Sequence, residues 1–163
     1  MPSSPQFWQT LTLVPMTADY ARAIAAWRYT PPYDWYNGDD DLDDAITYLL
    51  NPDFHYYAVL NADGELIAFR CFGADAHVAD GDYSADALDM GGGMRPDLTG
   101  QGLGAQIMLA AMAFAREHFQ PCAFRATVAA WNTRALKACF NAGYREVSRF
   151  VRHDGVEFVV VMR

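Results

Sequence analysis

A glycine-rich turn at residues 94–105 carries the residue spacing that best suits binding chemistry. Glycine occupies every second position at Gly100, Gly102 and Gly104, just before an apolar run with the pattern of a helix. Glycine lets the backbone approach a ligand closely, and the start of a helix presents unpaired N–H groups at the positive end of the helix dipole. The turn therefore predicts a phosphate-binding site, although glycines at this spacing also form ordinary turns.

The composition is that of a globular protein with one domain over residues 1–163. It is 52% hydrophobic and 20% charged, with a net charge of −8. Binding to nucleic acid needs clustered Lys and Arg, so this acidic balance argues against a nucleic-acid partner. Residues 1–9 are expected to be a loose N-terminal segment. They have no basic stretch followed by an apolar run, and no apolar run of about 18 residues occurs elsewhere, so no membrane partner is predicted.

The cysteines and histidines point to no metal site. Cys71, Cys122 and Cys139 are odd in number and widely spaced. They match neither the ligand spacing of a zinc site nor the disulfide framework of a secreted domain. The four histidines also lack metal-ligand spacing. We expect reduced thiols, a cytoplasmic protein and no bound metal.

The elements that must position the glycine turn are strands mixed with helices. Strands are predicted at residues 10–15, 54–60, 66–72, 88–94, 124–129, 147–152 and 156–162, and helices at residues 18–27, 42–50, 103–118 and 133–142. Thr17, residues 39–41 and Asn132 are the predicted N-caps. Glycines at 91–93 inside a strand predict a bulge or a splay, and the acidic residues 74–86 predict an exposed loop.

Two motifs at their mutual distance resemble the GNAT family of N-acetyltransferases. They are the turn that runs from Pro96 to Gly104 and the stretch N-T-R-A-L-K-A-C-F-N-A-G-Y at residues 132–144. The resemblance covers roughly residues 10–163. It implies a single-domain α/β fold, in which a mixed, mostly antiparallel sheet with a central splayed parallel pair is flanked by about four helices.

The resemblance also implies acetyl-CoA as the co-substrate, with no metal. Backbone amides of the turn would hold the pyrophosphate of acetyl-CoA, and free backbone groups of the splayed strand would pair with its pantetheine arm. A strand N–H near Met94 would polarise the thioester carbonyl. The implied cofactor-binding residues are Gly93, Met94, Leu98, Thr99, Gly100, Gln101, Gly102, Leu103, Gly104, Ala105 and Asn132.

Two positions depart from the family pattern. Thr99 stands where an Arg or Gln usually begins the glycine motif, so the cradle is expected to rest mainly on backbone amides. Cys139 falls on the tyrosine that protonates the leaving CoA thiolate. A thiol of ordinary pKa, about 8.5, can donate a proton, but burial in an apolar helix face is the commoner fate of such a cysteine.

The expected reaction is transfer of an acetyl group to a primary amine of a small molecule or of a protein or peptide N-terminus, by direct attack in a ternary complex. Asp89, on the strand before the turn, is a candidate base. Tyr33, Trp35 and Tyr36 follow paired prolines and are expected to wall the acceptor site with the acidic loop at residues 80–86, an arrangement that suits a cationic amine.

Two other functions match parts of the sequence pattern. The absence of the usual tyrosine motivates a non-catalytic acyl-CoA-binding or interaction module on the same fold. Gly100, Gly102 and Ala105 also satisfy the G-x-G-x-x-A pattern of dinucleotide sites. That context is wrong, because residues 95–99 separate the turn from its strand and residues 120–130 contain no acidic residue. A homodimer is compatible with the sequence, which does not determine the oligomeric state.

Overall fold

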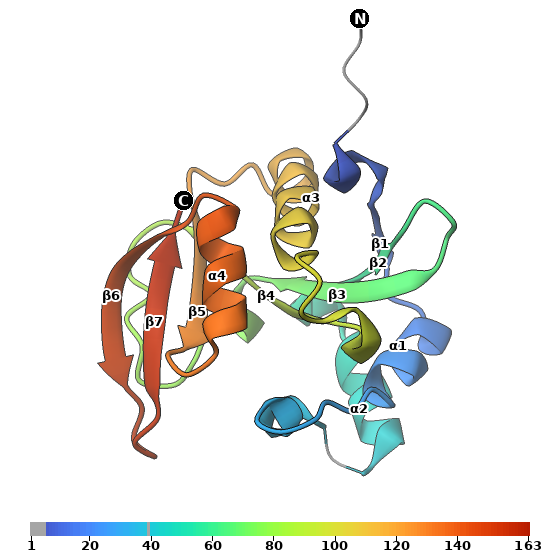
Figure 1. The fold of residues 1–163 in the computed structure, drawn as a ribbon, viewed down its shortest axis with the longest axis horizontal. Helices are drawn as coiled ribbons and strands as arrows, with labels where there is room; N and C mark the ends of the chain where they lie inside the picture. Colours follow the sequence, from blue (N-terminus) through green and yellow to red (C-terminus); the bar gives the residue numbers. More distant parts are fainter. Residues whose placement is uncertain (1–5, 39) are drawn as a thin grey trace, which may run out of the picture.

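The computed structural model describes residues 6–38 and 40–163, which form one seven-stranded mixed sheet flanked by helices (Figure 1). The strand order is β1-β2-β3-β4-β5-β7-β6. All neighbouring strands are antiparallel except β4 and β5 at the centre. The strands are β1 (Thr12–Pro15), β2 (Tyr56–Leu60), β3 (Leu66–Phe72), β4 (Leu88–Met94), β5 (Phe124–Ala129), β6 (Arg145–Val151) and β7 (Glu157–Met162). This architecture confirms the predicted fold class.

Four α-helices cover the two faces of the sheet. They are α1 (Ala18–Ala25), α2 (Leu42–Leu50), α3 (Gly104–His118) and α4 (Thr133–Asn141). Figure 1 shows α3 and α4 next to each other on one side and α1 and α2 on the other. Most of the buried core lies under α3, whose Ala111, Met112 and Ala115 are fully buried. This burial explains why the α3 sequence is apolar on nearly all sides.

Side-chain caps begin three of these helices as the sequence predicts. Thr17 accepts a hydrogen bond from the Tyr20 amide at 3.3 Å, and Asp41 accepts one from the Asp44 amide at 3.2 Å. Asn132 caps α4 in the same way. Each cap satisfies an N–H group that has no partner within its helix. Asp39, which was grouped with Asp41 as a predicted cap, lies outside the described residues.

Two predicted loose segments are more ordered than expected. Within residues 1–9, the structure describes residues 6–9, and Phe7–Thr10 form a short 3-10 helix whose Trp8 amide donates to Gln106 of α3 at 3.3 Å. In the acidic loop, Ala74–Ala76 form another 3-10 turn, and the Tyr83 hydroxyl is hydrogen-bonded to Thr127 of β5. Long-range contacts of this kind have no local sequence signal. Among the described residues, no helix has the length and apolarity needed to cross a bilayer.

The two halves of the sheet separate in the middle of β4. β4 pairs with β5 only through Leu88 with Phe124 and Asp89 with Arg125. Its other edge stays paired with β3 from Met90 to the end of the strand, without a register shift. The glycines of β4 therefore mark a splay away from β5. Residues 90–94 keep one edge free of strand partners, which is where the fold leaves room for a ligand.

Candidate functional site

The glycine turn presents a row of free amides at the start of α3. Gly100 and Gly102 have positive φ angles of 77° and 78°, a conformation that side chains disfavour. The first amide of the segment with a helical partner is that of Ile107, which donates to Leu103. Within the described chain, no hydrogen bond from the N–H groups of residues 100–106 to a backbone or side-chain acceptor is found. These donors at a helix N-terminus suit a phosphate group.

The glycines of the turn have different roles. A β-carbon added to Gly102 would meet no atom within 4 Å, so the space beside it is open. One added to Gly104 would lie 2.9 Å from the β-carbon of Ala138, so Gly104 serves the close packing of α3 against α4. One added to Gly100 would lie 3.6 Å from Nη1 of Arg134. Gly102 is thus the glycine that leaves room for a ligand.

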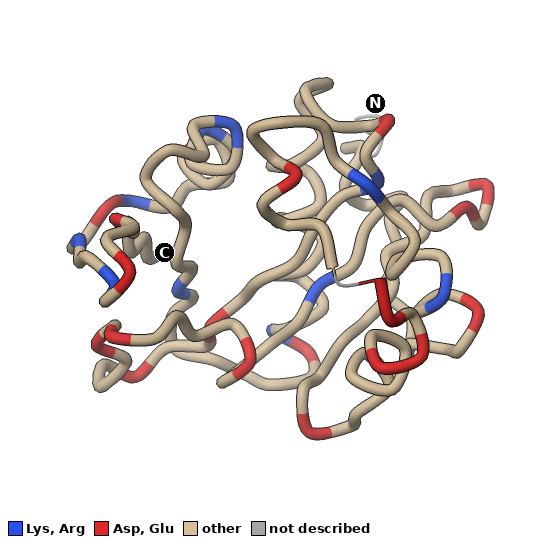
Figure 2. The backbone as a smooth tube through the Cα atoms, turned by 90° about the horizontal axis from the view of Figure 1, so that it is seen from below, with Lys and Arg blue, Asp and Glu red and all other residues tan. Residues whose placement is uncertain are grey.

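Arg134 adds a cation beside the backbone amides of the cradle. Its guanidinium lies beside Gly100 and stacks on the ring of Tyr33, 3.8 Å from the ring centroid. A cation from α4 therefore stands at the turn, where Thr99 supplies none. Figure 2 shows the backbone positions of the described Lys and Arg residues spread over several elements. The sequence missed this residue because its proximity depends on the packing of α4 against α3.

Asn132 joins the start of α4 to the aromatic loop. Its Oδ1 accepts a hydrogen bond from the Ala135 amide at 3.1 Å, and its Nδ2 donates to the Tyr36 hydroxyl at 3.0 Å. The Asn132 side chain is buried, and both of its polar groups have hydrogen-bond partners. Asn132 is therefore the predicted helix cap and also positions Tyr36.

The three predicted acceptor-site aromatics gather around Trp131, which the sequence did not single out. The ring centroids of Tyr33, Trp35 and Tyr36 lie 5.8, 5.6 and 5.6 Å from that of Trp131. Trp35 and Tyr36 remain 45% and 44% exposed. An aromatic surface this exposed next to Asn132 can bind a ligand by stacking or by cation–π contact.

The acidic loop is bound to the turn between β6 and β7. Asp80 accepts hydrogen bonds from the backbone N–H of His153, in the turn between β6 and β7, and pairs with its ring. Asp82 accepts from the Ser84 amide within the loop. These contacts bind the loop to the turn between β6 and β7, whose Arg152 lies 5.7 Å from the centroid of the Trp35 ring. The acidic loop is thus connected to the aromatic residues through this hairpin, and its part in an acceptor site stays a prediction.

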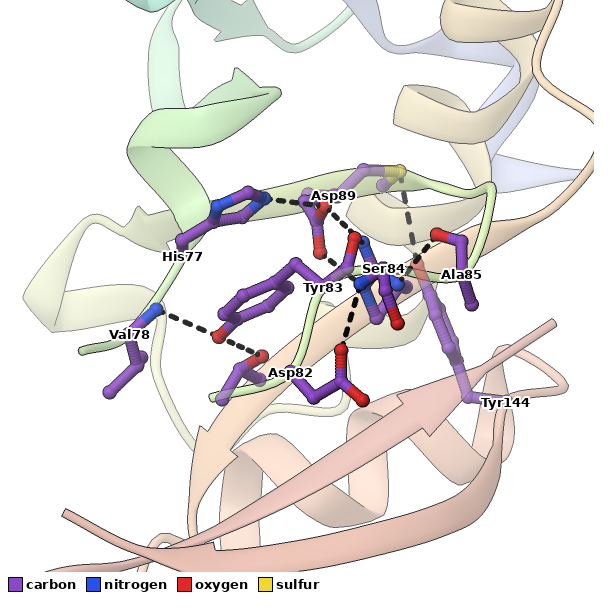
Figure 3. Close-up of polar contacts among 11 residues, drawn as sticks. His77, Val78, Asp82, Tyr83, Ser84, Ala85, Asp89 and Tyr144 are labelled. Carbon is purple, nitrogen blue, oxygen red and sulfur yellow. Dashed lines mark hydrogen bonds and ion pairs between the residues drawn. The ribbon is translucent and has the colours of Figure 1, made fainter. Parts of the chain in front are cut away.

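Asp89 is held in a buried ion pair (Figure 3). Arg125 of β5 binds both of its oxygens, at 2.7 and 2.8 Å, and His77 Nε2 lies 2.9 Å from one of them. The ring of Tyr83 stacks on His77 with centroids 3.8 Å apart. Both oxygens of Asp89 are occupied by partners within the fold, so the residue is part of the join between β4 and β5. Its role as a base stays a prediction.

Comparisons with known proteins now identify the family. Residues 20–144 match the acetyltransferase (GNAT) family. The chain belongs to this family. Its sequence has no significant match among curated proteins. The family confirms the predicted enzyme class, an acetyltransferase, and supports acetyl-CoA as its co-substrate.

Solved structures of this family share the fold of the acetyltransferase. The aminoglycoside acetyltransferase AAC(6')-Ib in complex with paromomycin and acetyl-CoA has a TM-score of 0.77 at 18% identity, covering 94% of this chain and 93% of that one. A chimeric spermidine N-acetyltransferase SpeG from Vibrio cholerae and hSSAT has a TM-score of 0.72 at 14% identity, covering 94% of both chains. A GNAT-family acetyltransferase from Bordetella pertussis has a TM-score of 0.69 at 19% identity, covering 94% and 95%.

Cys139 of the acetyltransferase is enclosed in the core between α3, α4 and β4. Its side chain is completely buried among residues that include Met90 and Tyr144. Burial raises the pKa of the thiol to about 11. A thiol with this pKa stays protonated at neutral pH and is a weak proton donor to a thiolate of ordinary pKa. The structure therefore favours a packing role for Cys139.

A Cys139→Ala variant is expected to keep its turnover within about tenfold of the original enzyme, because no proton transfer depends on the thiol. The measurement is thiol release from acetyl-CoA in the presence of an accepted amine. Its stability should fall slightly, since a small buried side chain is lost. A loss of turnover of about a hundredfold, with the fold retained, would show that Cys139 is the proton donor.

Asp75 is a second residue that the sequence placed only in an exposed acidic loop. It is half-buried, and its carboxylate accepts hydrogen bonds from the hydroxyls of Tyr48 and Tyr56. The same 3-10 turn packs against β4, because a β-carbon on Gly91 would lie 3.4 Å from that of Ala76. A carboxylate therefore faces the α1 and α2 side of the splayed strand. Nowhere in the described chain do three or more His, Cys, Asp or Glu side chains cluster in a way that could hold a metal ion.

Proposed function

We propose that this acetyltransferase transfers the acetyl group of acetyl-CoA to a primary amine by direct attack in a ternary complex. The observation that carries the proposal is the continuity of two sets of backbone groups, the free amides of residues 100–106 and the edge of β4 at residues 90–94 that has no strand partner. On that edge the Met94 carbonyl accepts a hydrogen bond from the Tyr29 hydroxyl at 2.7 Å. A diphosphate suits the amides of a helix N-terminus. An arm with amide groups of its own suits a free strand edge.

The proposed binding mode places the reacting end of the co-substrate near Met90. The diphosphate would lie at the turn, with Arg134 beside it, and the arm would follow β4 away from the turn. Because β4 rejoins β5 at Asp89, the arm must end there. Free N–H groups of the strand would then polarise the thioester carbonyl, which is the largest contribution that such a site can make to acyl transfer.

We propose that the acceptor is a small cationic amine. In the aromatic cluster, Arg134 and Arg152 already lie over the rings of Tyr33 and Trp35. The rings of Tyr36 and Trp131 can bind the cation of an acceptor. The Asp75 carboxylate adds a negative charge on the α1 and α2 side of β4. Enzymes of the same fold are named for aminoglycosides and for spermidine, which are small cationic amines. A protein or peptide N-terminus remains the alternative acceptor.

The test is thiol release from acetyl-CoA with a panel of amines. The panel comprises spermidine, an aminoglycoside and a short peptide with a free N-terminus. We expect release with at least one of the first two and little with the peptide. Release with the peptide alone would move the acceptor to that class. Tight binding of CoA with no release on any amine would contradict the enzyme and support a non-catalytic acyl-CoA-binding module.

A further inference from the structure

Arg70 on β3 is a buried cation without a partner. The residue is 7% exposed, and its Nε–H has no hydrogen-bond acceptor in the described chain. None of the ion pairs formed among the described residues includes it. A buried charge is strongly unfavourable unless it is paired, and a guanidinium keeps its proton inside proteins. Arg70 therefore lacks an electron-rich partner that a ligand could supply.

The side chain of Arg70 lies against Gly92 of β4, where a residue with a side chain would not fit. Arg70 lies opposite Gly92 in the β3–β4 register, and a β-carbon on Gly92 would lie 3.0 Å from its Cδ. Alternation along β3 gives the direction, since Phe69 packs against Trp27 after α1, whereas Phe72 packs against α3. Arg70 therefore projects on the α3 and α4 side of the sheet, into the splay.

Two side chains at the closed end of the splay lie within reach of the Arg70 charge. Burial raises the pKa of Cys139 on α4, and the Arg70 cation acts in the opposite direction. The same two effects act on the pKa of Tyr144, which the Asp89 carboxylate also raises. The Tyr144 hydroxyl is 3.8 Å from the sulfur of Met90, where the free edge of β4 begins (Figure 3).

We propose that Arg70 binds the sulfur of CoA and stabilises the thiolate that leaves during acetyl transfer. The inference rests on the proposed function, which brings the arm along β4 to the end where Arg70 lies. The acceptor nitrogen bonds to the acetyl carbonyl carbon, the C–S bond breaks, and its electron pair stays on sulfur. The proton of the amine passes to water. Arg70 keeps all of its protons and acts through charge alone.

This role also accounts for Cys139 at the position of the family's tyrosine. Cys139 is enclosed in the core, and burial raises the pKa of its thiol to about 11, so it is a weak proton donor. The Arg70 guanidinium would replace proton donation by electrostatic stabilisation of the leaving group. Arg70 would then be a catalytic residue of this enzyme, because it touches the reacting sulfur.

The test compares CoA with desulfo-CoA, which lacks the thiol, in calorimetric titrations from about pH 6 to about pH 9, a range that spans the ordinary titration of a thiol. The original enzyme should bind CoA more tightly as the pH rises, because the thiolate forms, and should bind desulfo-CoA equally across the range. Arg70→Met should lose about tenfold or more in affinity for CoA at high pH and little for desulfo-CoA. The exposed Arg145 supplies the control variant Arg145→Met, which should behave as the original enzyme.

Turnover gives a second reading. Arg70→Met should lower kcat by about a hundredfold and change the KM for acetyl-CoA little. A loss of this size is typical when an enzyme loses one hydrogen-bond donor to a negative charge that develops in the transition state. Arg70→Lys, which keeps the charge, should recover part of kcat. Equal weakening of CoA and desulfo-CoA by Arg70→Met would overturn the assignment to sulfur. Failure of the original enzyme to bind either compound would instead overturn the proposed function.

The ultraviolet absorbance of the thiolate tests the assignment in the original enzyme, so it does not depend on whether a variant folds. CoA bound to the enzyme should form the thiolate at a lower pH than free CoA. A bound thiol that titrates at or above the pH of the free thiol would overturn the role of Arg70.

Discussion

A Gly102→Val variant is expected to lose at least about a hundredfold in affinity for CoA, equivalent to about 2.7 kcal/mol, while it remains folded. The added side chain would fill the open space beside the free amides and keep a phosphate from reaching them. Several charge-assisted hydrogen bonds would be lost together. The fold should survive because no atom lies within 4 Å of the new β-carbon. The measurement is a calorimetric titration with CoA, accompanied by thermal unfolding.

Gly64→Val is the matched control for backbone strain. Gly64 has a φ of 79°, against 78° for Gly102, and it also has open space around its β-carbon position. It lies in the turn between β2 and β3, away from the cradle. Both variants carry the same strain, about 1–2 kcal/mol, but only Gly102→Val should lose CoA. Unchanged affinity in Gly102→Val would show that the turn is not the phosphate site.

An Arg125→Met variant is expected to lose about 3–5 kcal/mol of unfolding free energy, because it leaves the buried Asp89 carboxylate without its cation. Asp89 is 4% exposed and Arg125 is 3% exposed, so both charges are buried, and His77 is the side-chain partner that Asp89 would keep. These residues join β4 to β5 at one of their only two paired positions. The variant should therefore weaken the centre of the sheet. Chemical denaturation monitored by circular dichroism measures the change.

A double variant separates this pairing from simple loss of packing. Asp89→Leu combined with Arg125→Met removes both charges, and it should recover much of the stability lost by Arg125→Met alone. The exposed pair of Arg95 and Asp97 is the control, and Arg95→Met should change stability little. Additive losses in the double variant would show that Asp89 and Arg125 act independently.

The sequence predicts the elements of this fold well because most of their signals are local. Thr17, Asp41 and Asn132 are caps read from their own position, and Gly143, with a φ of 93°, ends α4 as predicted. The glycine turn was recognised in the same way, from residues adjacent in the chain. Such features depend on backbone conformation over a few residues, which composition and spacing reveal.

The partners of the site residues could not be predicted, because each one is brought in by a distant element. Arg125 reaches Asp89 across the parallel pair of strands, and Trp131 meets the aromatic loop across nearly a hundred residues of chain. Arg70 occupies an ordinary position in a strand pattern. The role proposed for Arg70 depends on its position opposite Gly92 and on the splay of β4 from β5. The sequence alone does not show that the Arg70 side chain points into this splay.

Amide hydrogen exchange with and without CoA tests the central claim most directly. The account predicts that CoA slows exchange at two places, residues 100–106 of the glycine turn and Met90, Gly92 and Met94, whose amides point to the free edge of β4, since these amides would gain acceptors. The hairpin of β6 and β7 should exchange as before. Binding of CoA that leaves both segments unprotected, or protects only other parts of the chain, would contradict the account.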